Sequence, residues 1–184
     1  MMTNASNPEG ADLSPLARID DPVVRTALGP AAPPVMGFIA SVEHFLGWAR
    51  SEPGEPEAEA RLVFRLLADL CREVLLIPDA APSEDKVEIP RADDHEWRRI
   101  YERAAALPVQ YYSVVFDPLE VPPSEAVVGD LADDLADIYR DLDYGHKLYE
   151  AGEHAEAAWQ WRFSFNHWGR HAMEGMRAIH AHLS

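Results

Sequence analysis

Trp159-Gln-Trp-Arg-Phe-Ser-Phe-Asn-His-Trp168 concentrates more aromatic surface than any other stretch of this chain. Three of the five tryptophans and two of the six phenylalanines lie within these ten residues. One aromatic side chain removes roughly 150–250 Å² of surface from water when it is buried. We therefore expect the hydrophobic core to form around this segment.

Two structures fit the aromatic segment locally. Its aromatic side chains alternate with polar ones at Trp159, Trp161, Phe163 and Phe165, which is the period of a half-buried strand. The flanking sequence favours a helix, because apolar residues downstream recur every three or four positions and no proline interrupts residues 153–184. We predict one long helix here, with a strand over residues 159–165 as the alternative.

The sequence just upstream predicts a second helix that packs on the first. Its apolar positions alternate in spacing between four and three residues, which gives a stripe along one side; they are Leu131, Leu135, Ile138, Leu142, Gly145 and Tyr149. Gly152 suits the end of this helix. The connection is too short to separate the two helices, so we expect an antiparallel hairpin.

The remaining chain adds three predicted helices, over about 35–49, about 57–76, and from Asp93 or Asp94 to Pro108. The segment 109–116 has strand propensity but no evident partner, so we predict a helical turn followed by extended chain. The fold class is all-α: a single-domain bundle of about five helices over residues 35–184. Residues 1–34 are expected to form an irregular arm, in which Val23, Val24 and Leu28 fit one helical turn.

Composition and charge narrow the function classes. The net charge of −16 disfavours nucleic acid and anionic membrane surfaces as partners. No segment has the ~18 consecutive apolar residues of a membrane span, and no signal sequence is visible, so we expect a cytoplasmic protein. The single cysteine, Cys71, excludes an internal disulfide and fits a small buried hydrophobe.

Three blocks of sequence resemble a known bacterial family. They are Tyr112-Ser-Val-Val-Phe-Asp-Pro118, Asp130-Leu-Ala-Asp-Asp-Leu-Ala-Asp-Ile-Tyr-Arg-Asp-Leu142, and Trp159-Gln-Trp-Arg-Phe-Ser-Phe165 with Trp168-Gly169. In order and spacing they are similar to the family catalogued as domain of unknown function 5063. The resemblance covers residues 110–183 well and 36–106 loosely. It implies a small, mainly helical, soluble bacterial protein, and it implies no activity, substrate or cofactor.

The predicted helix over 131–149 carries an acidic stripe at its start and along one side. Its members follow the spacing i, i+4, i+7 and i+11, which places them on one face beside the apolar stripe; they are Asp130, Asp134, Asp137 and Asp141. Like charges one turn apart destabilise a helix. We expect Arg162, an isolated cation among aromatic residues, to pair with the stripe. A solvated acidic face and a carboxylate site for binding or catalysis are the alternatives.

A histidine pair on the last predicted helix is a candidate metal site. His167 and His171 are one turn apart, and Glu174 follows at i+7, so all three project from one face. Helical bundles build metal sites from such side chains with carboxylates from a facing helix. Five of the eight histidines fall in the last 31 residues, so a structural or exposed role competes with this hypothesis.

Two functions of different class follow from these observations. The leading one is a non-enzymatic interaction or adaptor domain with an acidic surface, which binds another protein and uses no cofactor. In that interpretation Trp159, Trp161, Arg162, Trp168 and the acidic stripe have structural or interaction roles. The alternative is a metal- or small-molecule-binding helical protein, or an enzyme, that uses the histidines with a carboxylate. Convergence of His167, His171, Glu174 and an aspartate in one place would favour the alternative.

Overall fold

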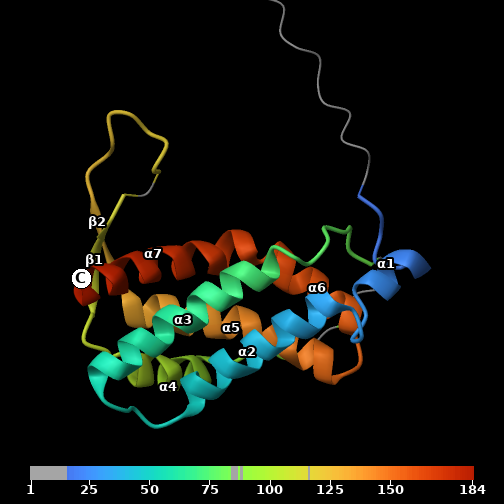
Figure 1. Cartoon of the computed structure of the whole chain (residues 1–184), viewed down its shortest axis with the longest axis horizontal. Coiled ribbons are helices and arrows are strands. Elements are labelled where there is room, and N and C mark those ends of the chain that lie inside the picture. The colour runs from blue at the N-terminus through green and yellow to red at the C-terminus, as the bar shows by residue number, and fades with distance from the viewer. Residues whose placement is uncertain (1–15, 84–86, 88, 116) are drawn as a thin grey trace, which may run out of the picture.

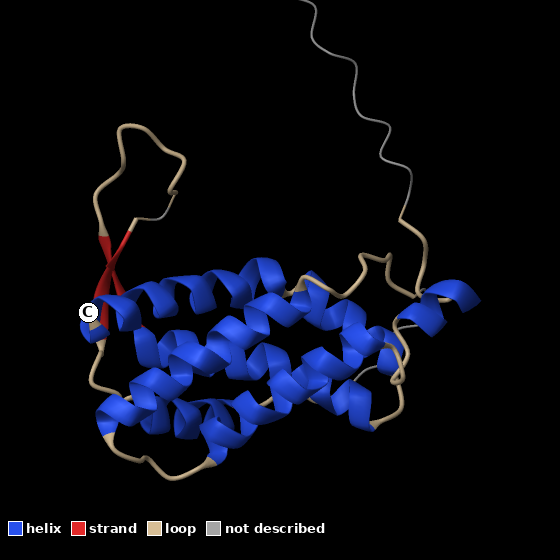
Figure 2. Ribbon diagram, in the orientation of Figure 1, coloured by secondary structure: helices blue, strands red, loops and turns tan. Residues whose placement is uncertain are grey.

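The computed structural model describes residues 16–83, 87, 89–115 and 117–184, which form a helical bundle with one small sheet (Figures 1 and 2). The elements are α1 (Pro22–Ala27), α2 (Pro33–Arg50), α3 (Pro56–Val74), α4 (Asp94–Ala104), β1 (Tyr111–Val114), β2 (Val127–Asp130), α5 (Leu131–Glu150), α6 (His154–Phe163) and α7 (Phe165–Leu183). The predicted mainly helical fold is confirmed. In this part of the chain, no helix combines the length and the apolar character that a membrane span requires.

Helix α5 lies at the centre of the bundle and contacts α2, α4, α6 and α7. Its predicted apolar stripe is buried up to Gly145, with Leu131, Leu135 and Leu142 fully inaccessible to solvent, and Tyr149 is half-buried. The helix ends at Glu150, and Gly152 follows with a φ of 89°, a left-handed conformation that favours glycine. The predicted hairpin is present, because α6 begins two residues later and packs on α5.

The aromatic segment is helical, but the prediction of one continuous helix was wrong. The helix breaks at Ser164, which separates α6 from α7. The Ser164 hydroxyl donates a 2.8 Å hydrogen bond to the carbonyl of Gln160, a local bond that bends helices. Across the break, the indole of Trp168 donates a 3.0 Å bond to the carbonyl of Trp161. This indole satisfies a backbone acceptor next to the break.

Two of the three tryptophans in the segment form the centre of the core. Trp161 and Trp168 are fully buried, and the ring of Phe38 from α2 lies 5.2 and 6.0 Å from them. Trp161 also donates a 3.0 Å hydrogen bond to the carbonyl of Leu142 on α5. Trp159 lies nearer the surface, where its ring stacks on that of Phe163 at 4.9 Å. The segment therefore joins α2, α5 and the C-terminal helices.

A β hairpin replaces the helical turn that we predicted after Pro108. Strands β1 and β2 pair antiparallel, with Tyr112 opposite Gly129. A Cβ atom at Gly129 would lie 2.7 Å from the Tyr112 ring, so only glycine leaves room for that ring. The loop between the strands projects away from the helices (Figure 2). This hairpin directs the Tyr112 side chain toward the start of α5.

The N-terminal residues that the structure describes are attached to the bundle. The helical turn that the sequence allowed near Val23 is present as α1. Ile19 and Leu28 are buried, and the amide of Ile19 donates a 2.9 Å hydrogen bond to the carbonyl of Ala81. The rest of the predicted arm, residues 1–15, lies outside the described residues.

Candidate functional site

The acidic stripe lies on α5 between α4 and α7, and its first member has a structural role. Asp130 caps α5, where its carboxylate accepts hydrogen bonds from the amides of Ala132 at 3.0 Å and Asp133 at 3.4 Å. It also accepts a 3.0 Å bond from the hydroxyl of Tyr101. These contacts fix the start of the helix, and the other three aspartates remain for the site.

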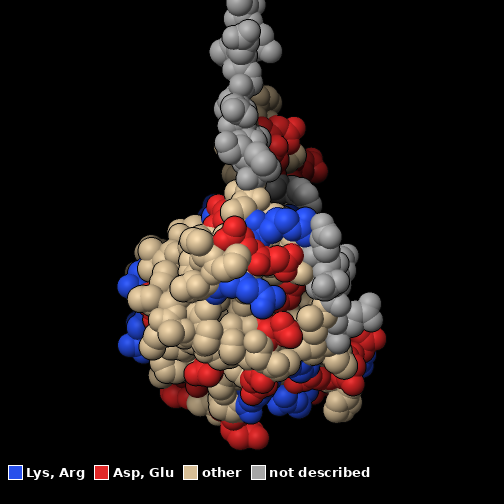
Figure 3. Space-filling view, turned by 90° about the vertical axis from the view of Figure 1, so that its right-hand side faces the viewer, with Lys and Arg blue, Asp and Glu red and all other residues tan. Residues whose placement is uncertain are grey.

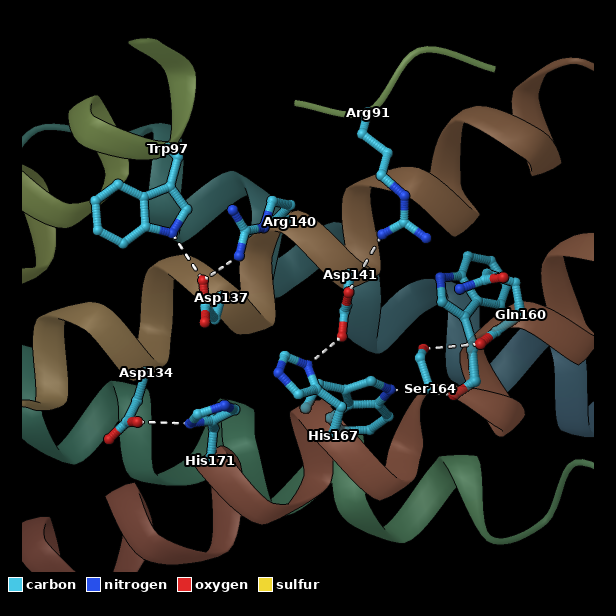
Figure 4. A network of polar contacts seen from close by, with 12 residues as sticks. Arg91, Trp97, Asp134, Asp137, Arg140, Asp141, Gln160, Ser164, His167 and His171 are labelled. Atoms are coloured by element: carbon cyan, nitrogen blue, oxygen red, sulfur yellow. Dashed lines mark hydrogen bonds and ion pairs between the residues drawn. The ribbon is translucent and has the colours of Figure 1, made fainter. Parts of the chain in front are cut away.

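Two histidines of α7 reach the stripe from the facing helix (Figure 4). The Nδ1 atom of His167 lies 2.8 Å from Oδ2 of Asp141, and Nδ1 of His171 lies 2.6 Å from Oδ1 of Asp134. The two rings contact each other edge to face, with centroids 4.9 Å apart. Each ring is therefore oriented through Nδ1 by its own carboxylate.

Asp137 stands between these two pairs and completes a triad. One carboxylate oxygen of Asp137 and one ring nitrogen from each of His167 and His171 all lie within 4.8 Å of one another. Because both Nδ1 atoms already bind aspartates, the Nε2 atoms are the ones that remain for a ligand. A histidine that is held through one nitrogen and presents the other is the usual arrangement around a protein-bound metal ion.

The carboxylate of Asp137 is itself held from α4 and from its own helix, α5. Its Oδ1 atom accepts a 2.9 Å hydrogen bond from the indole of Trp97 on α4 and lies 2.7 Å from the guanidinium of Arg140 (Figure 4). One oxygen is thus engaged and the other remains for an ion. Ligands at about 2.0–2.2 Å from a tetrahedral ion lie about 3.3–3.6 Å apart, so binding requires the ligand atoms, now within 4.8 Å of one another, to approach by roughly 1 Å.

Local electrostatics favour a cation at this place. The hydrogen bond that His171 donates to Asp134 raises the pKa of His171, although burial acts in the opposite direction. Burial, and then the charges of Asp137 and Asp134, raise the pKa of Asp133. Crowded carboxylates that favour a bound proton would be relieved by a metal cation, which competes with protons for the same groups.

Tyr112, on strand β1 of the β hairpin, holds the Asp134 carboxylate that orients His171. The hydroxyl of Tyr112 donates a short hydrogen bond to Oδ2 of Asp134, whose other oxygen binds His171. Burial, followed by this bond, raises the pKa of Tyr112 well above its ordinary value, so the phenol stays protonated and donates. Asp141 is similarly flanked by Arg91 at 3.6 Å.

The triad is accessible to small molecules. The side chain of His167 is 48% exposed and that of His171 is 11% exposed. A cavity of about 230 Å³ reaches His171, and a second of about 360 Å³ reaches Asp137. Asp133 belongs to the lining of both cavities. An ion in the triad would therefore have coordination positions open to solvent or to a substrate.

The structure brings together most of the residues that the sequence predicts for the site, with two exceptions. Glu174 is not part of the triad; it lines the cavity on the His171 side, together with Tyr112 and Arg170. The predicted pairing of Arg162 with the acidic stripe is wrong, because Arg162 binds Asp79 with its Nε atom 2.9 Å from Oδ1. The break at Ser164 places Arg162 on α6, whereas the histidines of α7 meet the stripe.

Sequence reasoning missed the residues that support the triad from outside the helical hairpin. Trp97 and Tyr112 come from α4 and β1, and nothing in their local sequence marks them as partners of the stripe. Arg140 did carry a signal, because it follows Asp137 by three residues and helical residues at that spacing are neighbours.

Comparisons with known proteins identify the family and the fold. The family described as "Domain of unknown function (DUF5063)" matches residues 35–184. The crystal structure of protein BF1032 from Bacteroides fragilis is similar, with a TM-score of 0.69 and 18% sequence identity over 82% of this chain and 92% of that one. At that identity the likeness concerns the fold alone. No curated protein matches the chain.

Proposed function

This chain belongs to the DUF5063 family, and we propose that it binds a divalent transition-metal ion through Asp137, His167 and His171. The observation that supports the proposal is the convergence of these side chains within 4.8 Å, with both histidines oriented by separate aspartates. Ordinary ion pairs between histidine and aspartate do not require a third carboxylate between the rings. A metal site does.

The donor atoms point to a particular class of ion. Two imidazole nitrogens and one carboxylate oxygen suit Zn²⁺, Fe²⁺, Co²⁺ or Mn²⁺, whereas Ca²⁺ and Mg²⁺ take oxygen ligands. Three protein ligands leave at least one coordination position open, which is typical of sites that bind or activate a small molecule. The proposed function is therefore metal-dependent binding or catalysis at the groove along α5.

The test is a metal titration of purified, chelator-treated protein. We expect one equivalent of Zn²⁺ or Co²⁺ to bind, measured by calorimetry and by competition with a chromophoric chelator. His171→Gln and Asp137→Asn should each weaken binding at least roughly 100-fold, because each removes one of three ligands. His180→Gln, on the exposed face of the same helix, is the matched control and should bind as the wild type does.

Two results would exclude this function. One is binding of less than a tenth of an equivalent of any first-row divalent ion. The other is equal affinity in the wild type, His171→Gln and Asp137→Asn, which would place the ion elsewhere. Circular dichroism of each variant separates loss of the site from loss of the fold.

The interaction role that the sequence predicts has its own support in the β hairpin. Every residue from 117 to 128 is exposed, including Leu119 at 87% and Val121 at 88%. No lysine or arginine occurs between Arg103 and Arg140. An exposed apolar loop with acidic neighbours suits a protein partner whose binding surface is apolar and basic.

The acidic charge itself is a weaker argument for a partner. On the face near α1, acidic and basic side chains are interspersed and form no patch of one sign (Figure 3). The β hairpin is therefore the element to test for binding of a partner. A double variant, Leu119→Ser with Val121→Ser, should lose a partner that the wild type captures from its host, while retaining metal. Equal capture by both proteins would exclude the hairpin as the binding element.

A further inference from the structure

The cavity beside Asp137 combines a ligand of the triad with cationic and aromatic side chains. It is lined by Asp94, Trp97, Arg98, Asp133, Asp137 and Arg140, and its volume is about 360 Å³. We propose that this cavity binds a small molecule with a phosphate-like oxyanion, and that it does so only when an ion occupies the triad. This inference rests on the proposed metal site and extends it to a class of ligand.

Because of the charge of the cavity lining, binding of the oxyanion should depend on a bound metal ion. Three carboxylates face two guanidinium groups around the cavity, so without an ion the lining carries one net negative charge. A divalent ion on Asp137 changes this sum to one net positive charge. An anion is thus repelled by the metal-free cavity and attracted by the metal-loaded one.

The two arginines supply donors of suitable shape. Arg140 uses one nitrogen to contact Oδ1 of Asp137 at 2.7 Å, and its side chain is 37% exposed. Arg98 is exposed on α4, on the same cavity. A planar guanidinium fork matches the oxygens of a phosphate or phosphonate. The anion would meet the ion beside Asp137, the triad residue that lines this cavity, while its other oxygens bind these side chains.

The remaining wall is rigid and aromatic. The ring of Trp97 stacks on that of Tyr101 with centroids 5.5 Å apart, and its indole nitrogen is held by Asp137. This leaves the cavity with an ordered aromatic edge against which a ring of the ligand can pack. A volume of this size, which falls at the lower end of small-molecule sites, suits a metabolite-sized compound better than a polymer.

Asp133 is a lining carboxylate on which negative charge is unfavourable. Burial, and then the nearby charges of Asp137, Asp134 and Asp130, raise its pKa. A metal cation at Asp137 would offset these negative charges, as the proposal requires.

The test uses the full chain, with and without one equivalent of Co²⁺, and phenylphosphonate as the probe. Phenylphosphonate is a stable oxyanion with one aromatic ring. We expect calorimetry to detect binding to the Co²⁺-loaded protein, with a change in the visible cobalt spectrum, and no binding to the metal-free protein. Arg98→Gln and Arg140→Gln should each weaken binding at least roughly tenfold.

Arg99→Gln is the matched control. Arg99 is adjacent on α4 but lines a different cavity, next to Arg50 and Arg103, so its variant should bind the probe as the wild type does. Metal affinity is measured first for every variant. A variant that still binds the metal but loses the probe then tests the oxyanion site separately from the metal site.

Four outcomes would overturn the inference. If Co²⁺ binds but phenylphosphonate does not, the metal site stands and the oxyanion site falls. If the metal-free protein binds the probe equally well, the dependence on metal is wrong. If neither Arg98→Gln nor Arg140→Gln weakens binding, the probe occupies another place. Failure of Co²⁺ and of every other first-row divalent ion to bind would remove both proposals.

Discussion

Gly145→Ala tests how closely α5 and α6 approach in the core. A Cβ atom at this position would lie 2.1 Å from Nε1 of Trp161 and 2.5 Å from its Cδ1. Ordinary contact begins near 3.4 Å, so the indole would have to move by about 1 Å. Trp161 has little freedom to do so, because it is fully buried beside Phe38 and Tyr149.

The magnitude follows from three opposing effects. Overpacking of a core typically costs about 1–3 kcal/mol. Movement of the indole also weakens its 3.0 Å bond to the carbonyl of Leu142, which contributes about 1 kcal/mol. Replacement of glycine by alanine inside a helix returns about 1 kcal/mol. We therefore expect Gly145→Ala to lower the free energy of unfolding by about 1–3 kcal/mol.

Urea unfolding followed by far-ultraviolet circular dichroism measures this change. Gly47→Ala is the matched control, because Gly47 is exposed within α2 and its added Cβ would meet nothing within 4 Å. The control should gain about 0.5–1 kcal/mol from helix propensity. A Gly145→Ala protein as stable as the wild type, or more stable, would refute the close approach of α5 and α6.

Three further predictions concern single side chains. Tyr112→Phe removes the hydrogen bond to Asp134, and a chelator competition should show roughly tenfold weaker metal binding; unchanged affinity would contradict the role of that bond. Burial raises the pKa of Cys71 to about 11, so iodoacetamide at pH 8 should alkylate the folded protein at least roughly 100-fold more slowly than the urea-unfolded chain. Burial tends to raise the pKa of Glu59, but hydrogen bonds, first from Arg103, outweigh it and lower that pKa. The resulting stability is present above the unfolded pKa, about 4.3, and disappears as the pH falls through the folded pKa. Glu59→Gln should therefore be less stable than the wild type at pH 7, and the difference should shrink as the pH falls below about 4.3; a gap independent of pH would exclude this ionic contribution.

Helix periodicity accounts for most of the fold, and the errors have local causes. The apolar stripe on α5 is visible in the sequence because a helix repeats its face every three or four residues. The β hairpin is not visible in the sequence, because the partner of strand β1 lies beyond a loop, in the four residues Val127–Asp130. A strand of that length shows no pattern of its own. The break at Ser164 depends on a hydroxyl bond that many helical serines also make.

Helix periodicity also made part of the candidate site visible in the sequence. The spacing of His167 and His171 places them on one face, and the stripe on α5 is likewise a matter of period. Which residue of the last helices meets the stripe depends on rotation and packing. Even on a continuous helix, Arg162 and His171 would lie about 180° apart, so only one of them could face α5. Burial of Trp161 and Trp168 decides this, and it turns the histidines toward the aspartates.

The central claim is that Asp137, His167 and His171 hold a metal ion, and anomalous X-ray diffraction from crystals grown with Zn²⁺ tests it most directly. We expect one strong zinc peak between α5 and α7, with the Nε2 atoms of both histidines at about 2.0–2.1 Å and an oxygen of Asp137 at about 2.0–2.2 Å. Asp134 and Asp141 should remain on the Nδ1 atoms. Crystals without zinc at this position, or with both histidines still turned only toward their aspartates, would contradict the account.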